Sequence, residues 1–222
     1  MPRGTRRIAI CGVDEAGKGP VLGPLVVAGV GCRSMEDFRD IPVKDSKLLT
    51  RRQREDLYEE ITNRFPCAVI VIEASEIDCI RTRMTMNRCV AEAHARVIRE
   101  LRPATAYVDA CDVNAPRYAM MVGEHLAAPC RIVSEHAADR TYPVVSAASI
   151  VAKVRRDRAI DELKEQYGEI GSGYPSDPET VEYLKGYIAR HRRPPACARA
   201  SWRTVGNLMA DAEQQQLVSG NE

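Results

Sequence analysis

The sequence predicts an α/β fold: a mixed central sheet flanked by helices, with a small helical region at the C-terminal end. Short apolar runs rich in Val, Ile and Gly alternate with longer segments whose apolar residues recur at helical spacing. The first two apolar runs are joined by a single turn, which indicates an antiparallel strand pair at the start of the sheet.

The apolar runs give the expected strands. They lie at residues 7–13, 21–32, 67–74, 104–111 and 130–139, the last including an exit loop. The first run stops on Asp14-Glu15, the fourth stops on Asp109, and the fifth leads to Asp139. Three strands therefore finish on or just before acids, where burial of a charge is costly unless something offsets it.

The expected helices lie at residues 50–64, 86–101, 115–127, 143–168, 178–191 and 201–216. Thr50 is a suitable N-cap for the first helix, and Pro116 stands in the first turn of the third. The fourth helix is small and apolar at its start and charged later. We place the boundary between the main domain and the helical C-terminal region at 176/177.

The composition is that of an ordinary globular protein. Of 222 residues, 45% are apolar and 28% charged, and the net charge of +1 by itself argues neither for nor against a nucleic-acid partner. No apolar run approaches the roughly 18 residues of a membrane span. No signal-peptide pattern precedes the first strand. The eight cysteines form no C-x-x-C pair, so we expect reduced thiols in a cytoplasmic protein rather than a zinc cluster.

The strand-end acids are candidate metal ligands. Ligand sites in α/β sheets gather at strand ends, and carboxylates brought together there repel one another. Oxygen donors favour Mg²⁺ or Mn²⁺, and two such ions about 4 Å apart can catalyse displacement at phosphorus. Asp14, Glu15, Asp109 and Asp139 could instead be turn residues, caps or salt-bridge partners, and their spacing alone does not decide.

Five segments resemble motifs of the type 2 ribonucleases H, the ribonuclease HII family, in an archaeal-like form. They read GVDEAGKGPVLGPLVVAGV at 12–30, DSKLLT at 45–50, YVDA at 107–110, DRTYPVVSAASIVAKVRRDR at 139–158 and GSGYPSDPET at 171–180. The resemblance runs in order from residue 7 to about 205. It implies an RNase H-like catalytic domain at 1–176 and a helical region at 177–222 that assists duplex binding.

The resemblance also implies an activity. The enzyme would hydrolyse RNA strands in RNA–DNA hybrids, incise beside single ribonucleotides in duplex DNA, and leave 3′-hydroxyl and 5′-phosphate ends. Asp14 would bridge two metal ions, Glu15 and Asp109 would help to hold the ion on the leaving-group side, and Asp139 would ligate the ion that activates water. All four acids are present.

Substrate contacts follow from the same resemblance. Gly17, Lys18 and Gly19 would lie against the 2′-hydroxyl that distinguishes RNA from DNA, although a plain tight turn is the alternative. Lys18 stands where many members have Arg. Tyr174 would check the ribose and stack near the junction, unless it is only a surface anchor.

Further contacts to phosphate are implied for Lys47, Ser146 and Ser149. Lys47 could also be an ordinary charge flanking a helix, and Leu48 follows it where a second Lys is frequent. The two serines could donate to phosphate from a helix start, but close helix packing explains them equally well.

The segment 189–203 predicts a phosphate-tracking arm. It has no acid and five arginines: Arg190, Arg192, Arg193, Arg199 and Arg203. Arg155, Arg156 and Arg158 form a second basic group, which neighbouring acids dilute. We expect a monomer whose Trp202 pins the last helix, and we do not expect the tail to bind a sliding clamp, because the aromatic pair of such peptides is absent.

Three other functions are alternatives to this ribonuclease activity. A hybrid-binding protein without catalysis would not need all four acids. A phosphatase or phosphotransferase for small molecules would need a nucleotide pocket, and no G-x-x-x-x-G-K loop is present. A related hybrid nuclease with weak action at single ribonucleotides differs in its preference for longer ribonucleotide tracts.

Overall fold

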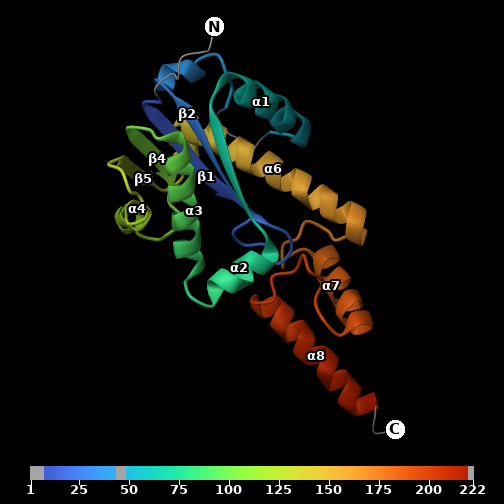
Figure 1. The fold of residues 1–222 in the computed structure, drawn as a ribbon. Coiled ribbons are helices and arrows are strands. Elements are labelled where there is room, and N and C mark those ends of the chain that lie inside the picture. Colours follow the sequence, from blue (N-terminus) through green and yellow to red (C-terminus); the bar gives the residue numbers. More distant parts are fainter. Residues whose placement is uncertain (1–7, 44–48, 220–222) are drawn as a thin grey trace. The chain divides into compact units, whose positions relative to one another are not determined.

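The computed structural model describes residues 8–43 and 49–219. Its strands are β1 (Ile10–Ala16), β2 (Leu25–Cys32), β3 (Cys67–Ile72), β4 (Thr105–Asp109) and β5 (Arg131–Glu135). Its helices are η1 (Met35–Phe38), α1 (Arg51–Arg64), α2 (Ala74–Arg81), α3 (Met86–Leu101), α4 (Ala115–Gly123), α5 (Ala138–Thr141), α6 (Pro143–Tyr167), α7 (Pro178–His191) and α8 (Arg203–Ser219). Every predicted strand and helix is present (Figure 1).

The helices η1, α2 and α5 were not predicted. Helix α2 has Glu73 at its N-cap position, and no side chain there bonds the first turn. The usual sequence signal for a helix start is therefore missing. By contrast, the predicted Thr50 cap of α1 is confirmed, because its hydroxyl accepts from the backbone N–H of Gln53.

The chain folds into two compact units. Unit 1 contains residues 1–16, 26–71 and 85–155, and unit 2 contains residues 17–25, 72–84 and 156–222. These units do not follow the boundary expected at 176/177, because segments 17–25 and 72–84 pack with the C-terminal helices. Whether the C-terminal region assists duplex binding stays a prediction.

Unit 1 is built on the mixed five-stranded sheet in the order β3-β2-β1-β4-β5. The predicted antiparallel start is confirmed, because β1 and β2 pair antiparallel from Ile10–Cys32 to Ala16–Val26. β1 then pairs parallel with β4, and β4 pairs parallel with β5. The carboxyl ends of β1, β4 and β5 therefore lie at the same edge of the sheet.

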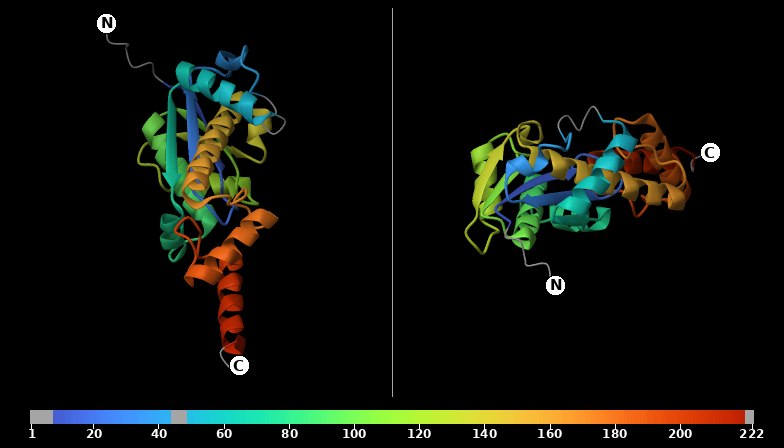
Figure 2. Two further views of the ribbon diagram at one scale, coloured as in Figure 1. Left: turned by 90° about the vertical axis from the view of Figure 1, so that its right-hand side faces the viewer. Right: turned by 90° about the horizontal axis from the view of Figure 1, so that it is seen from above.

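Helices cover both faces of this sheet. Alternate residues of β2, from Val26 to Cys32, form a buried apolar cluster with residues of α1 and α6. Gly29 points the other way, since a Cβ there would lie 2.2 Å from Cγ1 of Val97 in α3. α1 and α6 therefore pack on one face and α3 on the other, with α4 against α3 and β5 (Figure 2).

Gly12 allows α6 to approach the sheet closely. A Cβ on Gly12 would lie 2.3 Å from the carbonyl carbon and oxygen of Val144, near the start of α6. Real side chains do not tolerate such a separation, so only glycine fits at this position. This close packing brings the first turns of α6 against β1, directly before the two acids of that strand.

Unit 2 has its own apolar core. Val21, Leu22 and Ile170 pack there with Leu184 of α7 and Val205 of α8. Backbone bonds tie the early segment to the late one, including Gly23 N–H to the carbonyl of Cys197 at 2.9 Å. Residues 17–25 are thus held by the C-terminal part of the chain.

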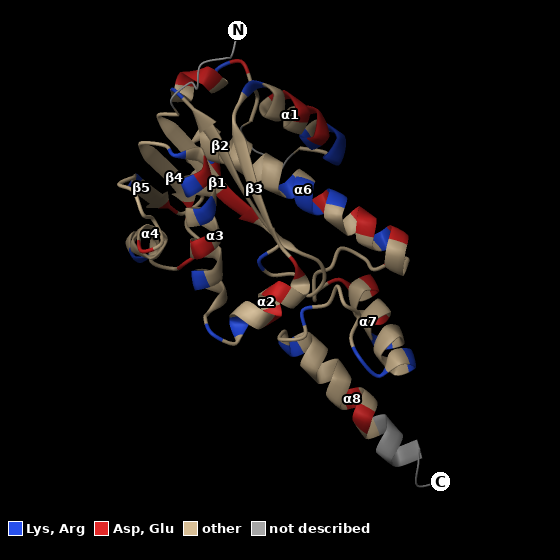
Figure 3. Ribbon diagram, in the orientation of Figure 1, with Lys and Arg blue, Asp and Glu red and all other residues tan. Residues whose placement is uncertain are grey.

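Charged residues gather on the helices, whereas the strands are mostly apolar (Figure 3). The charged part of β1 is its Asp14-Glu15 end. All eight cysteines are free. Among the described residues, no helix has both the length and the apolar character needed to cross a membrane.

Candidate metal site and glycine loop

Asp14 and Asp109 lie level with each other at the carboxyl ends of neighbouring parallel strands. The pairing of β1 with β4 ends at Val13–Val108, and the two acids are the next residues. Asp109 pairs in turn with β5, and Asp139 follows that strand in α5. Three segments far apart in sequence therefore deliver an acid to one edge of the sheet.

Asp14 points to the face of the sheet covered by α6. Its side chain is only 6% exposed, and it accepts a hydrogen bond from Ser149, whose oxygen accepts in turn from Lys153. Burial raises the pKa of Asp14 well above its ordinary value, and the nearby charges of Glu15 and Asp109 raise it further. Ser149 and Lys153 oppose that rise.

Glu15 starts on the opposite face, because successive residues of a strand point to opposite sides. Its Oε2 lies 3.1 Å from Nε2 of His94 in α3. The other ring nitrogen of His94, Nδ1, lies 3.2 Å from Oη of Tyr118 in α4. Both His94 and Tyr118 are fully buried.

Asp109 and Asp139 lie close enough to influence each other. Oδ1 of Asp109 accepts a hydrogen bond from the N–H of Ala138 at 2.9 Å, which ties the end of β4 to α5. Burial raises the pKa of Asp109, and the charges of Asp139 and Glu15 add to the rise. Asp139 itself is 7% exposed.

The donor set suits a hard divalent cation. All four acids offer carboxylate oxygens, which Mg²⁺ and Mn²⁺ prefer, and a cation would relieve their mutual repulsion. In the described part of the chain, however, no three His, Cys, Asp or Glu side chains are already spaced to hold a metal ion. Because Asp14 and Glu15 leave β1 on different faces, ion binding requires their carboxylates to turn toward the common strand end.

A second candidate element is the glycine loop, residues 17–23, in unit 2. Gly17 has a φ of +89°, which favours glycine, and a Cβ there would lie 2.6 Å from the carbonyl oxygen of Pro24. Gly19 has space around it, since the nearest atom to its Cβ would be a ring carbon of Tyr174 at 3.9 Å. The loop is thus tight at one glycine and open at the other.

Arg199 and Trp202 hold the backbone carbonyls of the glycine loop. The fully buried guanidinium of Arg199 donates from Nη2 to Gly17 at 2.6 Å, from Nη1 to Lys18 at 3.1 Å and from Nε to Gly23 at 3.0 Å. Trp202 lies 4.9 Å from that guanidinium and donates from Nε1 to the Gly19 carbonyl at 3.1 Å. Trp202, which was predicted to pin the last helix, packs on the cluster that contains Val205 of α8 and in addition holds this loop.

Arg156 lies between the glycine loop and Tyr174. Its guanidinium is 5.2 Å from the Tyr174 ring centroid and donates to the carbonyl of Ser172 at 3.3 Å. A Cβ on Gly17 would lie 2.7 Å from Nε of Arg156. Tyr174 is 42% exposed, whereas Arg156 is buried. Gly17 and Tyr174 are thus gathered around one buried arginine.

The remaining predicted contacts are placed differently. Ser146 is buried and its hydroxyl donates to the carbonyl of Val43, and Ser149 bonds Asp14 as described above. Both hydroxyls are engaged within the protein, and their phosphate roles stay predictions. Lys47 lies outside the described residues.

Two of the arginines expected to face nucleic acid do not do so. Arg199 and Arg156 are buried and bond backbone carbonyls, so their assignment to basic surfaces is wrong. His136, three positions before Asp139 in the sequence, is exposed, and His94 is the histidine that bonds Glu15. A polar residue on the otherwise apolar inner face of α3 was the available signal for His94.

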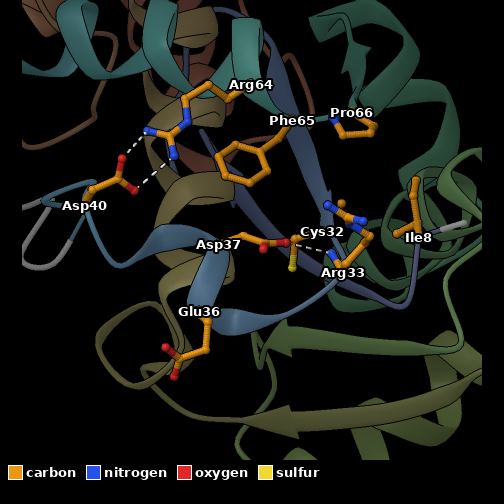
Figure 4. Close-up of a pocket in the computed structure, with 10 residues that line it drawn as sticks. Ile8, Cys32, Arg33, Glu36, Asp37, Asp40, Arg64, Phe65 and Pro66 are labelled. Carbon is orange, nitrogen blue, oxygen red and sulfur yellow. Dashed lines mark hydrogen bonds and ion pairs between the residues drawn. The ribbon is translucent and has the colours of Figure 1, made fainter. Parts of the chain in front are cut away.

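A separate pocket of about 390 Å³ in unit 1 contains none of the predicted site residues. Ile8, Phe65 and Pro66 line it together with charged side chains (Figure 4). Those charges are compensated locally, as when Arg64 pairs with Asp40 at 2.9 Å. Burial raises the pKa of the Cys32 thiol there to about 12, which leaves it unreactive.

Comparisons with known proteins converge on one family. The sequence model of the family described as Ribonuclease HII matches residues 11–205. A Ribonuclease HII from Methanoregula boonei is 59% identical over 95% of this chain and 99% of its own length. The crystal structure of the ribonuclease H2 from Pyrococcus horikoshii OT3 superposes with a TM-score of 0.87 at 41% identity, over 92% of this chain and 99% of that one. The Archaeoglobus fulgidus RNase HII, solved in a complex with PCNA, superposes with a TM-score of 0.83 at 45% identity, over 88% of this chain and 96% of that one.

Proposed function

The chain belongs to the ribonuclease HII family, and we propose on that premise that it cleaves RNA within RNA–DNA hybrids and incises duplex DNA beside single ribonucleotides. It is thus a ribonuclease H, a metal-dependent endonuclease that leaves 3′-hydroxyl and 5′-phosphate ends. One observation carries the proposal: Asp14 and Asp109 stand at matching positions at the carboxyl ends of the neighbouring strands β1 and β4, and Asp139 follows β5 at the same edge of the sheet.

The acids would hold the metal. Two Mg²⁺ or Mn²⁺ ions on Asp14, Glu15, Asp109 and Asp139 would lower the pKa of a water molecule and offset developing charge on the phosphate. The chain's own contribution is to orient these carboxylates and, at Asp14 and Asp109, to oppose part of the pKa rise that burial causes. Two of them already accept a hydrogen bond that favours the charged form: Ser149 serves Asp14, and the Ala138 N–H serves Asp109.

Lys153 of α6 favours the ionised form of Asp14. It donates to Ser149, and its positive charge lowers the pKa of Asp14 against the effect of burial. A buried carboxylate that must bind a cation at neutral pH has to lose its proton first. The Lys153–Ser149 pair thus reduces the cost of ionising Asp14 before metal arrives.

The glycine loop would recognise the ribose. Its carbonyls at Gly17, Lys18 and Gly19 are held by Arg199 and Trp202, so the loop backbone is fixed before substrate binds. A fixed backbone can discriminate by close approach to the 2′-hydroxyl, the group that distinguishes RNA from DNA. We assign the same task to Tyr174. A backbone contact would also explain why Lys can stand where many members have Arg.

Duplex binding is assigned to exposed basic residues. Arg190, Arg192 and Arg193 at the end of α7 and Arg203 at the start of α8 are all exposed. Each arginine that neutralises a phosphate should contribute about 0.9 to the slope of log affinity against log salt. Lys47 retains its proposed phosphate contact. We propose a cytoplasmic monomer whose tail does not bind a sliding clamp.

Cleavage of three matched duplexes tests this proposal. Each carries one end-labelled strand, with a single ribonucleotide, a tract of four ribonucleotides or DNA alone. We expect Mg²⁺- or Mn²⁺-dependent cleavage of the first two with 3′-hydroxyl ends, no cleavage of the third, and none by Asp14→Asn.

Each rival gives a different pattern. Binding of the hybrid without cleavage would favour a catalytically inactive hybrid-binding protein. Cleavage of the four-ribonucleotide tract alone would favour a nuclease with weak action at single ribonucleotides. Full activity of Asp14→Asn would contradict the site assignment.

A further inference from the structure

Helix α3 carries one polar side chain on its buried face that the proposed reaction does not yet use. His94 is fully buried among apolar neighbours such as Val90, Ala91 and Val97. A buried imidazole is costly unless both ring nitrogens are satisfied. Here both are satisfied, one by Glu15 and one by Tyr118.

The direction of these hydrogen bonds can be worked out from their partners. Ionised Glu15 can only accept, so Nε2 of His94 carries a proton and donates it to Oε2. In the neutral ring Nδ1 is then the acceptor, and the hydroxyl of Tyr118 donates to it. Burial raises the pKa of Tyr118 well above its ordinary value, so its hydroxyl keeps the proton that it donates.

The pair is also fixed in orientation. The rings of His94 and Tyr118 meet edge to face, with centroids 5.6 Å apart and planes at 85°. Both side chains are fully buried, on α3 and α4, within unit 1. The imidazole therefore cannot turn away from Glu15 without breaking its bond to the phenol and displacing the packing around it.

We propose that His94, locked by Tyr118, is a positioning residue that orients the Glu15 carboxylate for metal binding. Oε2 is anchored by the imidazole, which fixes the plane of the carboxylate and directs the second oxygen. Side-chain freedom that Glu15 would otherwise lose on binding a cation is already restricted in the free protein. Hydrogen-bond partners of metal ligands typically change metal affinity or activity by about 10–100-fold.

This inference rests on the proposed function, since it assumes that Glu15 is a ligand. It goes beyond that function because it assigns a task to two residues outside the five motifs. Among the described residues, His94 is the histidine that contacts a predicted ligand. The contact joins residues 79 positions apart in sequence.

The test measures binding of Mn²⁺ alone to the full chain, by calorimetry and by electron paramagnetic resonance, without nucleic acid. His94→Phe keeps a ring but removes the donor, and we expect Mn²⁺ affinity to fall by about 10–100-fold. His94→Gln restores an N–H donor and should recover part of that loss. Tyr118→Phe keeps His94 but frees Nδ1, and a smaller loss is expected.

Val97→Ala is the matched control, because Val97 is buried in the same helix and packs against the sheet rather than against Glu15. It should lower thermal stability and leave Mn²⁺ affinity unchanged. Wild-type Mn²⁺ affinity in folded His94→Phe, or in Tyr118→Phe should His94→Phe fail to fold, overturns the inference. Higher affinity would also overturn it, since His94 would then hold Glu15 away from the ion.

Failure of the proposed function and failure of the positioning role of His94 give different results. If the wild-type chain neither binds Mn²⁺ nor cleaves a hybrid, the proposed function is overturned and this inference with it. If the wild type does both and the His94 and Tyr118 variants bind Mn²⁺ equally well, only the positioning role is overturned.

Discussion

Replacing Arg199 should loosen the glycine loop, because this side chain holds three of the loop's carbonyl groups. The guanidinium makes three bonds to loop carbonyls, the shortest being 2.6 Å to Gly17. A hydrogen bond from a charged donor contributes about 1.5–3 kcal/mol, and neighbouring bonds are not additive. We therefore expect Arg199→Met to destabilise unit 2 by about 4 kcal/mol, a large share of a typical 5–15 kcal/mol.

Trp202 provides the assay, because it is the single tryptophan of the chain and stacks on Arg199. Urea unfolding followed by its fluorescence should show a midpoint lowered by about 2 M, for a slope of about 2 kcal/mol per M. Arg199→Lys keeps the charge but not the fork of donors, so an intermediate midpoint is expected. Exposed Arg203 is the matched control, and Arg203→Met should change stability by less than about 0.5 kcal/mol.

If Arg199→Met unfolded at the same urea concentration as the wild type, Arg199 would not stabilise the glycine loop. If Arg199→Lys matched the wild type, the fork geometry would be unnecessary. A variant that is stable but has lost selectivity for a single ribonucleotide would support the loop's role in ribose recognition, independent of its role in stability.

Three further outcomes are expected. Gly12→Ala places a Cβ 2.3 Å from the Val144 backbone, so it should shift α6 and destabilise the protein by more than about 4 kcal/mol; a near-normal melting temperature would contradict this. Tyr174→Phe should reduce incision at a lone ribonucleotide, and unchanged incision would discard its role. Hydrogen bonds from the Ser172 hydroxyl and N–H lower the pKa of Asp177 to about 2. The ionised carboxylate therefore stabilises its loop above its ordinary pKa, and this contribution is lost as the pH falls through about 2. A carboxyl NMR titration midpoint near the ordinary value of 3.8 would contradict it.

The sequence was most informative where a local pattern determines local structure. Period and capping predicted α1 with its Thr50 cap, and α3 and α7 within their observed bounds. Strands ending on acids made Asp14, Asp109 and Asp139 candidates for one site, and the parallel pairing of β1 with β4 and of β4 with β5 places these strand ends at one edge of the sheet. Helix α2 was missed because it is short and has no capping side chain.

Long-range contacts could not be predicted from the same patterns. Arg199 stands in a run of arginines that looks like a phosphate arm, yet it is buried against a loop 176 to 182 residues earlier in the chain. In the sequence, His94 looks like any polar residue of an amphipathic helix, and only the packing of α3 against β1 reveals its contact with Glu15. In both cases the partner is chosen by tertiary packing, which neither charge pattern nor periodicity encodes.

Diffraction from crystals soaked in Mn²⁺ would show whether the four acids bind metal, because the anomalous signal locates the ions themselves. We expect Mn²⁺ at the shared edge of β1 and β4, within bonding distance of Asp14 and Asp109, with a second ion about 4 Å away. Mn²⁺ bound elsewhere, with no signal beside Asp14, would contradict the claim that these acids form the catalytic metal site.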